Sequence, residues 1–254
     1  MPPAQPPAVP ILPQGPTARP DSQAARRSIL GALRAGAPAA PLPAPDLAAY
    51  RSGPYGQGSQ GPRPDPAALA DRFEAAARGW RAEVLRASPA SWPEAVRQAL
   101  DRRGCRRVVV GATDPLAARL DPALQGLALQ RFDRPIEQWK IELFDHIDAG
   151  ITSTEAGIAD TGTLVLRPGP QEPRTLSLVP PLHVAVLMAS RLYASLAAAM
   201  RALSPEADMP TNLLLVTGPS KTADIQQVLA YGAHGPKALV IVLVDDLAEG
   251  GATS

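Results

Sequence analysis

The sequence has very little cysteine: one residue, Cys105, among 254. No intrachain disulfide can form, and this chain alone cannot build a cysteine-ligated iron–sulfur cluster or a four-ligand zinc site. We therefore expect no metal and no cofactor in this chain. Cys105 directly precedes an apolar run and has no nucleophile signature around it. These features favour a buried structural thiol.

Long hydrophobic runs and an excess of one charge are also missing. The longest apolar stretch, Ala238–Val244, is far shorter than the roughly 20 residues that span a bilayer. The first residues have neither the basic nor the apolar region of a secretory signal, so we expect a cytoplasmic protein. Lys and Arg number 25 against 24 for Asp and Glu, which gives no general reason to expect a nucleic acid partner or an anionic membrane surface.

Proline is abundant and unevenly spread, since 16 of the 30 prolines lie in the first 66 residues. We expect a disordered Pro-rich tail at 1–20, a short amphipathic helix at 21–36 and a Pro/Gly-rich linker at 37–64. The remaining residues, 65–254, are long enough to form one folded domain with its own core.

Apolar strands alternate with helices in this last segment. Strands are predicted at 107–111, 127–132, 163–166, 183–187, 213–217 and 239–244. Helices are predicted from Asp65 through Val84, over 91–104, around 116–120, over 190–203 and over 222–231. The alternation indicates an α/β domain whose mainly parallel sheet carries helices on both faces.

Hydroxyl and carboxylate side chains gather between Gly150 and Thr163, just before a predicted strand. Backbone amides and hydroxyls in such a segment can surround a small polar ligand. The alternative is a set of turns that feed the strand, with hydroxyls that only cap them. The candidates for ligand binding and proton transfer here are Thr152, Glu155, Asp160, Thr161, Gly162 and Thr163.

A second candidate segment, Gly218–Ile225, follows the predicted strand at 213–217. A strand, a glycine turn and the start of a helix would offer free amides beside Lys221 to an anion. The P-loop spacing is absent, so the segment gives no motif support for ATP binding. An ordinary helix cap is the alternative. The candidate anion-binding residues are Gly218, Ser220, Lys221 and Thr222.

The three histidines differ in their surroundings. His234 lies between small residues in a turn and is a candidate acid/base near neutral pH. His183 begins an apolar strand, which favours a hydrogen-bonded core residue. His146 has no second histidine at metal-ligand spacing, so we expect no metal there.

Four ordered motifs resemble one known family. They are Gly162–Leu166, Ser177–Val184, Gly218–Ile225 and Ala233–Pro236. Together they are similar to the LUD domain of the lactate utilization protein C family, most closely over residues 140–246. Lys221 stands where the family often has arginine, and Asp160 where glutamate is usual; both changes keep the sign of the charge.

The resemblance implies a fold and a pathway. The fold would be similar to the NagB/RpiA/CoA transferase-like fold. Family members act with two partner subunits, both iron–sulfur proteins, in a bacterial cytoplasmic system that oxidises L-lactate to pyruvate. The clusters belong to those partners, which suits a chain with one cysteine.

Three functions stay open at this point. In the first, the segments at 152–162 and 218–222 converge with His234 at the strand ends and bind a small carboxylate for the lactate-oxidising complex. In the second, the chain is an independent isomerase or acyl transferase acting on a phosphorylated or CoA-linked molecule, with Glu155 or Asp160 as base or nucleophile. In the third, it is a non-catalytic scaffold that docks through the helix at 21–36.

Overall fold

The computed structural model describes residues 22–36, 65–112, 115–203, 210, 212–223, 229–232 and 234–247. The chain divides into two units, at residues 1–47 and 48–254. The first contains helix α1 (Ser22–Ala35). The predicted tail at 1–20 and linker at 37–64 lie outside the described residues. No described helix is both long enough and apolar enough to cross a membrane.

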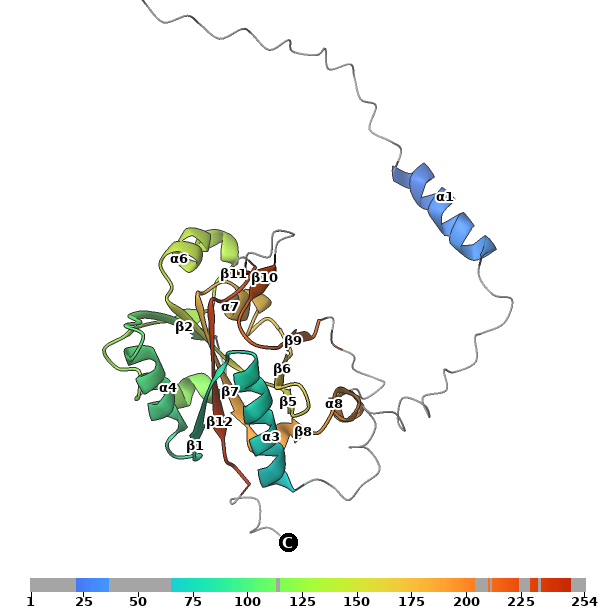
Figure 1. The fold of residues 1–254 in the computed structure, drawn as a ribbon. Coiled ribbons are helices and arrows are strands. Elements are labelled where there is room, and N and C mark those ends of the chain that lie inside the picture. Colours follow the sequence, from blue (N-terminus) through green and yellow to red (C-terminus); the bar gives the residue numbers. More distant parts are fainter. Residues whose placement is uncertain are drawn as a thin grey trace, which may run out of the picture. The chain divides into compact units, whose positions relative to one another are not determined.

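The second unit is built on a parallel sheet of six strands (Figure 1). The strands are rich in buried apolar residues, such as Val108 to Val110 in the strand Arg107–Gly111, as expected for a parallel sheet covered on both faces. In spatial order the strands are β1 (Glu83–Ala87), β12 (Ala238–Val244), β7 (Leu182–Met188), β4 (Ala149–Ser153), β2 (Arg107–Gly111) and β3 (Ala128–Phe132).

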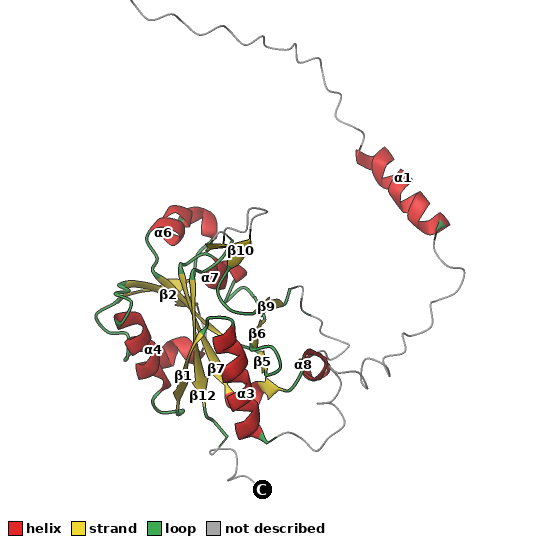
Figure 2. Ribbon diagram, viewed as in Figure 1, coloured by secondary structure: helices red, strands yellow, loops and turns green. Residues whose placement is uncertain are grey.

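Side chains that alternate along these strands enter two separate cores. Helices α4 (Trp92–Asp101) and α5 (Pro115–Leu120) cover one face, and α3 (Pro66–Gly79) packs on the other (Figure 2). The second face also carries α6 (Lys140–Asp145) and α7 (Arg174–Leu178), whose apolar side chains pack on Val109. The prediction of an α/β fold with helices on both faces of a parallel sheet is therefore confirmed.

A smaller sheet lies over the α3 face, where Leu164 and Leu166 join the same core as Phe73. Its four strands, in order, are β8 (Leu192–Tyr193), β5 (Ala156–Ile158), β6 (Thr163–Leu166) and β9 (Leu214–Val216). Two strands predicted from their apolar runs, β6 and β9, thus pair antiparallel in this sheet and not in the central one.

Three of the predicted helices are wrong in part or whole. The helix expected to run from Asp65 through Val84 ends at Gly79, because Arg81 takes a left-handed conformation at φ 68°, and the chain then enters β1. The helix expected over 190–203 is a short 3-10 turn (Ala189–Arg191), β8 and then α8 (Leu196–Leu203).

The helix expected over 222–231 does not form at its two described ends. Strand β10 (Lys221–Ala223) pairs antiparallel with β11 (Leu229–Tyr231), and residues 224–228 lie outside the described part of the chain. The 3-10 turn η1 (Ile136–Gln138) completes the described elements.

Candidate functional site

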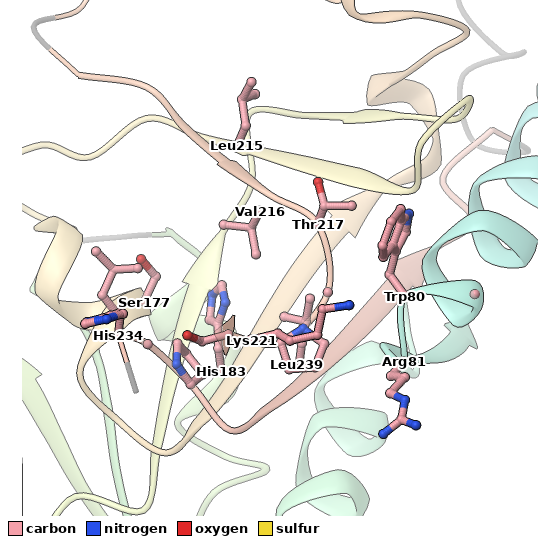
Figure 3. Close-up of a pocket in the computed structure, with 17 residues that line it drawn as sticks. Trp80, Arg81, Ser177, His183, Leu215, Val216, Thr217, Lys221, His234 and Leu239 are labelled. Atoms are coloured by element: carbon pink, nitrogen blue, oxygen red, sulfur yellow. The ribbon is translucent and has the colours of Figure 1, made fainter. Parts of the chain in front are cut away.

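A cavity of about 510 Å³ opens at the edge of the central sheet where β7 and β12 begin. Residues from three of the four sequence motifs line it: Ser177 to His183 in part, Gly218 to Lys221, and His234 to Pro236. In the view of Figure 3, Trp80 and Arg81 lie on one side of the cavity, and Ser177 and His234 lie on the other. The site is therefore at the amino ends of these strands.

One wall forms where the turn after β9 meets the end of α3. Gly218 has φ +73°, and a Cβ there would lie 2.3 Å from the carbonyl oxygen of Trp80. Only glycine allows this approach without strain. The contact sets Trp80 and Arg81 beside the residues that follow Gly218.

The opposite wall depends on α7 and on the pairing of two loop segments. A Cβ on Gly150 would lie 2.1 Å from the carbonyl oxygen of Leu176, so α7 sits directly on β4 and brings Ser177 to the cavity. The backbone amide of Ser220 donates to the carbonyl of Pro236 at 2.9 Å. This bond holds the Gly218–Lys221 segment next to the segment that carries His234.

The charges around the cavity have one sign. Within the described part of the chain its lining contains no Asp or Glu, and it contains Lys221 and Arg81. The Lys221 Nζ lies 5.7 Å from the centre of the Trp80 ring, a distance at which the cation is attracted to the ring face. Trp80, Lys221 and His234 are all exposed at the mouth. The arrangement favours an anionic ligand.

The floor of the cavity is polar but uncharged. His183 is 1% exposed, and its Nε2 lies 2.8 Å from Oγ1 of Thr152, which is 2% exposed. Burial lowers the pKa of His183 from 6.5 to about 4, because charging the imidazole away from water is costly. The ring is therefore neutral near pH 7. The prediction that His183 is a buried, hydrogen-bonded residue is confirmed, but it also faces the cavity.

A chain of hydroxyls joins two predicted threonines to the mouth. Thr161 Oγ1 lies 2.7 Å from Thr163 Oγ1, which lies 2.8 Å from Thr217 Oγ1. Thr217 lines the cavity. Gly162, between them, has φ +63° and packs so closely on α3 that a Cβ would lie 2.2 Å from the amide nitrogen of Ala77. Its conformation positions the two threonines.

The two predicted carboxylates do not reach the cavity lining. Asp160 forms an ion pair with Arg72 at 2.8 Å, and Glu155 Oε2 lies 4.0 Å from Nε of Arg167. The structure therefore brings five of the predicted residues to one cavity and leaves the two carboxylates outside it. Gly218, Ser220, Lys221 and His234 line the cavity, and Thr152 bonds the lining residue His183.

The expected anion site at a helix start is wrong in its geometry. Lys221 begins a strand, and the amide and carbonyl of Ser220 are both used in backbone hydrogen bonds, to Pro236 and Gly232. The amide of Ser220 is thus not free for an anion. The groups that could still bind one are the Lys221 ammonium and the nearby hydroxyls. Thr222 is described only in its backbone, within β10.

Several lining residues were not predicted from the sequence. Trp80 falls inside the longer helix that was predicted, but it follows α3 and is 50% exposed at the mouth. Ser177 and His183 lie within a motif that resembles the family, and this was the available signal for both. Nothing in the sequence around Arg81 pointed to the cavity.

Metal and thiol chemistry find no support among the described residues. No group of three or more His, Cys, Asp or Glu side chains within them could hold a metal ion. The one cysteine, Cys105, is buried, as predicted, and burial raises the pKa of its thiol.

Sequence comparison relates the chain to several bacterial proteins. It is 42% identical over 178 residues to an uncharacterized protein of Neisseria meningitidis serogroup B, covering 68% of this chain and 75% of that protein. It is 30% identical over 190 residues to lactate utilization protein C of Deinococcus radiodurans, covering 72% and 85%. With lactate utilization protein C of Shouchella clausii it shares 34% identity over 116 residues, which cover 44% of this chain and 48% of that relative.

A solved structure supports the fold. The crystal structure of a DUF162 family protein from Deinococcus radiodurans matches with a TM-score of 0.55 and 24% identity, over 71% of this chain and 98% of that one. The LUD domain model matches residues 70–244, which contain every strand of the two sheets and all the described residues that line the cavity. The chain therefore belongs to the LUD domain family.

Proposed function

We propose that this chain is the LUD subunit of a bacterial cytoplasmic system that oxidises L-lactate to pyruvate, and that its cavity holds a small carboxylate. It would act with two iron–sulfur protein subunits. Relatives that share up to 34% identity with the chain carry the name lactate utilization protein C. A chain with a single cysteine suits a system whose clusters are bound by its partners.

One observation carries the carboxylate site: the cavity gathers cations and no described carboxylate. Lys221 stands at the mouth, and the lining described by the structure contains no Asp or Glu beside it. The hydroxyls of Ser220 and Thr217 lie among the same residues. An organic acid would find both a charge partner and hydrogen bonds there.

Of the three predicted proton-transfer residues, His234 is the best placed. It lines the cavity beside Lys221, whereas Glu155 and Asp160 are close to arginines elsewhere. Imidazole is the side chain that most often serves as a general acid or base. We assign His234 the role of exchanging protons with the bound acid.

The test is purification of the tagged chain from its native cells grown on lactate, gently and without oxygen. We expect two cysteine-rich proteins to co-purify, with the broad visible absorbance of iron–sulfur clusters. The same purification from cells grown without lactate is the control.

A colourless protein without partners, purified from lactate-grown cells, would contradict the proposed role. Turnover of a phosphorylated or CoA-linked substrate by that isolated chain would favour an independent isomerase or acyl transferase instead.

A further inference from the structure

The cavity has charged side chains at its mouth and uncharged polar side chains at its floor. Lys221, Arg81 and His234 are exposed at the mouth, whereas Ser177 and His183 are buried at the floor, 3% and 1% exposed. A carboxylate that moved to the uncharged floor would lose its hydration and would find no cation there to compensate for the loss. A bound anion therefore keeps its charged group at the mouth and directs an uncharged part inward.

The imidazole at the floor is held in one orientation. Thr152 lies on β4 and His183 on the neighbouring strand β7, and their side chains are joined at 2.8 Å through Nε2. That bond is the one hydrogen bond of this ring within the described chain. The second ring nitrogen is left to pair with a ligand oxygen.

Beside this imidazole the cavity is apolar. Leu239 on β12 is the register partner of His183, so both side chains stand on the same face of the sheet, and both line the cavity. Val216 of β9 adds an apolar wall. In the view of Figure 3 the Val216 side chain points toward the other labelled residues, whereas Leu215 points away from them.

The volume exceeds what a three-carbon acid needs. At about 510 Å³ the cavity is in the range of roughly 300–1,000 Å³ that encloses drug-sized ligands. Lactate would leave most of this space, and most of the apolar wall, in contact with water. Burying apolar ligand surface there would strengthen binding.

We propose that the cavity selects 2-hydroxy or 2-oxo acids whose side chain is larger than the methyl group of lactate. The carboxylate lies at Lys221, the 2-oxygen bonds His183, and the side chain packs against Leu239 and Val216. Thr152 acts as a positioning residue, because it fixes the imidazole. This assignment rests on the proposed carboxylate site and extends it from lactate to a class of substrates.

Calorimetry with three matched pairs of acids tests the proposal on the full chain. The pairs are lactate and propionate, 2-hydroxyisocaproate and 4-methylpentanoate, and phenyllactate and 3-phenylpropionate. We expect each buried methylene to tighten binding about fourfold. Each hydroxy acid should bind about tenfold tighter than its partner, as expected for one net hydrogen bond in a buried site.

Variants assign the selectivity to named residues. In His183→Phe the preference for the hydroxy acid should fall to about one, while the dependence on side-chain size remains. Thr152→Val, which keeps the shape of the side chain, should reduce the preference without abolishing it. His146→Phe, at an exposed histidine outside this cavity, is the control. A general loss of folding would weaken both members of a pair equally and leave their ratio unchanged.

Each outcome decides between this inference and the function on which it rests. Equal affinity within each pair, or lactate binding more tightly than phenyllactate, overturns the inference and leaves a simple carboxylate site. Absence of binding by all six acids overturns the carboxylate site itself. A third outcome is a preference for hydroxy acids that is lost in His183→Phe, in a protein that purifies without iron–sulfur partners. This outcome supports the substrate class and contradicts only the lactate-oxidising role.

Discussion

The two ends of the central sheet treat their polar side chains differently. At the carboxyl end, Ser153 donates its hydroxyl and its amide to Glu172 at 2.6 and 3.1 Å, and Ser190 bonds Asp246 at 2.5 and 2.8 Å. At the amino end, the Lys221 ammonium group has the Trp80 ring as its one partner within the described chain. Polar groups at the first end satisfy each other, whereas the second end leaves positive charge for a ligand.

The difference in pairing identifies which polar cluster is a candidate site. Ligands in open α/β sheets commonly bind at the carboxyl ends of strands, and on that rule alone the Ser153 cluster would be chosen. The hydrogen bonds favour the amino end instead. The polar groups at the carboxyl end already bond each other, so a ligand would add little binding free energy there.

The largest effect is expected from Gly218→Ala, which should collapse the wall of the cavity. A Cβ 2.3 Å from the Trp80 carbonyl and a left-handed backbone should together destabilise the protein by about 4 kcal/mol. Urea unfolding measures the change. Gly104→Ala is a matched control, since Gly104 has φ +65° with no atom within 4 Å of its Cβ position, and it should cost about 1 kcal/mol. Equal losses in the two variants would show that the contact with Trp80 is unimportant.

Stability at the cavity floor should depend on pH. The folded protein keeps His183 neutral down to a pKa of about 4, while the unfolded chain takes up a proton near 6.5. The unfolded state then binds more protons between these values, so the free energy of unfolding should fall by about 3 kcal/mol as pH drops from 6.5 to 4. His183→Gln should flatten this dependence and His146→Gln should not. A profile that His183→Gln leaves unchanged would contradict the buried, neutral imidazole.

At the carboxyl end, Ser153→Ala should affect stability and not binding. The hydroxyl donates to the Glu172 carboxylate at 2.6 Å, and its removal should cost about 2 kcal/mol in urea unfolding. The affinity for L-lactate, measured by calorimetry, should stay within about twofold of the parent protein, since additivity holds for distant sites. Weaker lactate binding in this variant would mean that the two ends of the sheet are coupled.

The smallest effect is a change in tryptophan quenching. Trp80 is 50% exposed at the mouth, whereas Trp92 and Trp139 are 1% and 3% exposed. A ligand that fills the cavity should shield Trp80 from acrylamide and roughly halve the accessible fluorescence. Trp80→Phe should abolish the ligand effect. Shielding that persists in this variant would place the ligand elsewhere.

Much of the fold could be predicted from local sequence. The runs at 107–111 and 239–244 are apolar and β-branched, and both form strands of the buried sheet. Strand β1 was missed, because Glu83 and Arg86 interrupt its apolar pattern at the edge of the sheet. The pairing of 221–223 with 229–231 was missed because three-residue strands are too short for their periodicity to distinguish them from a helix.

The site could be predicted only in part, because local sequence patterns identify chemical groups but not the space between packed elements. Gly218, Ser220, Lys221 and His234 lie in short motifs with chemical character, and all four line the cavity. His183 lies in an apolar strand, so its sequence indicated a core residue. That it borders a cavity depends on the space left between α3, β9 and the sheet, which no local pattern encodes.

The carboxylate site is best tested by titrating L-lactate into the Lys221→Ala protein. We expect binding about tenfold weaker than in the parent, which is about 1.4 kcal/mol, with the urea midpoint unchanged. Lys140→Ala is the matched control, because Lys140 Nζ also lies near an aromatic ring, 5.9 Å from Phe144, but outside the cavity. Equal affinity in the parent and both variants would contradict an anion site at the amino end of the sheet.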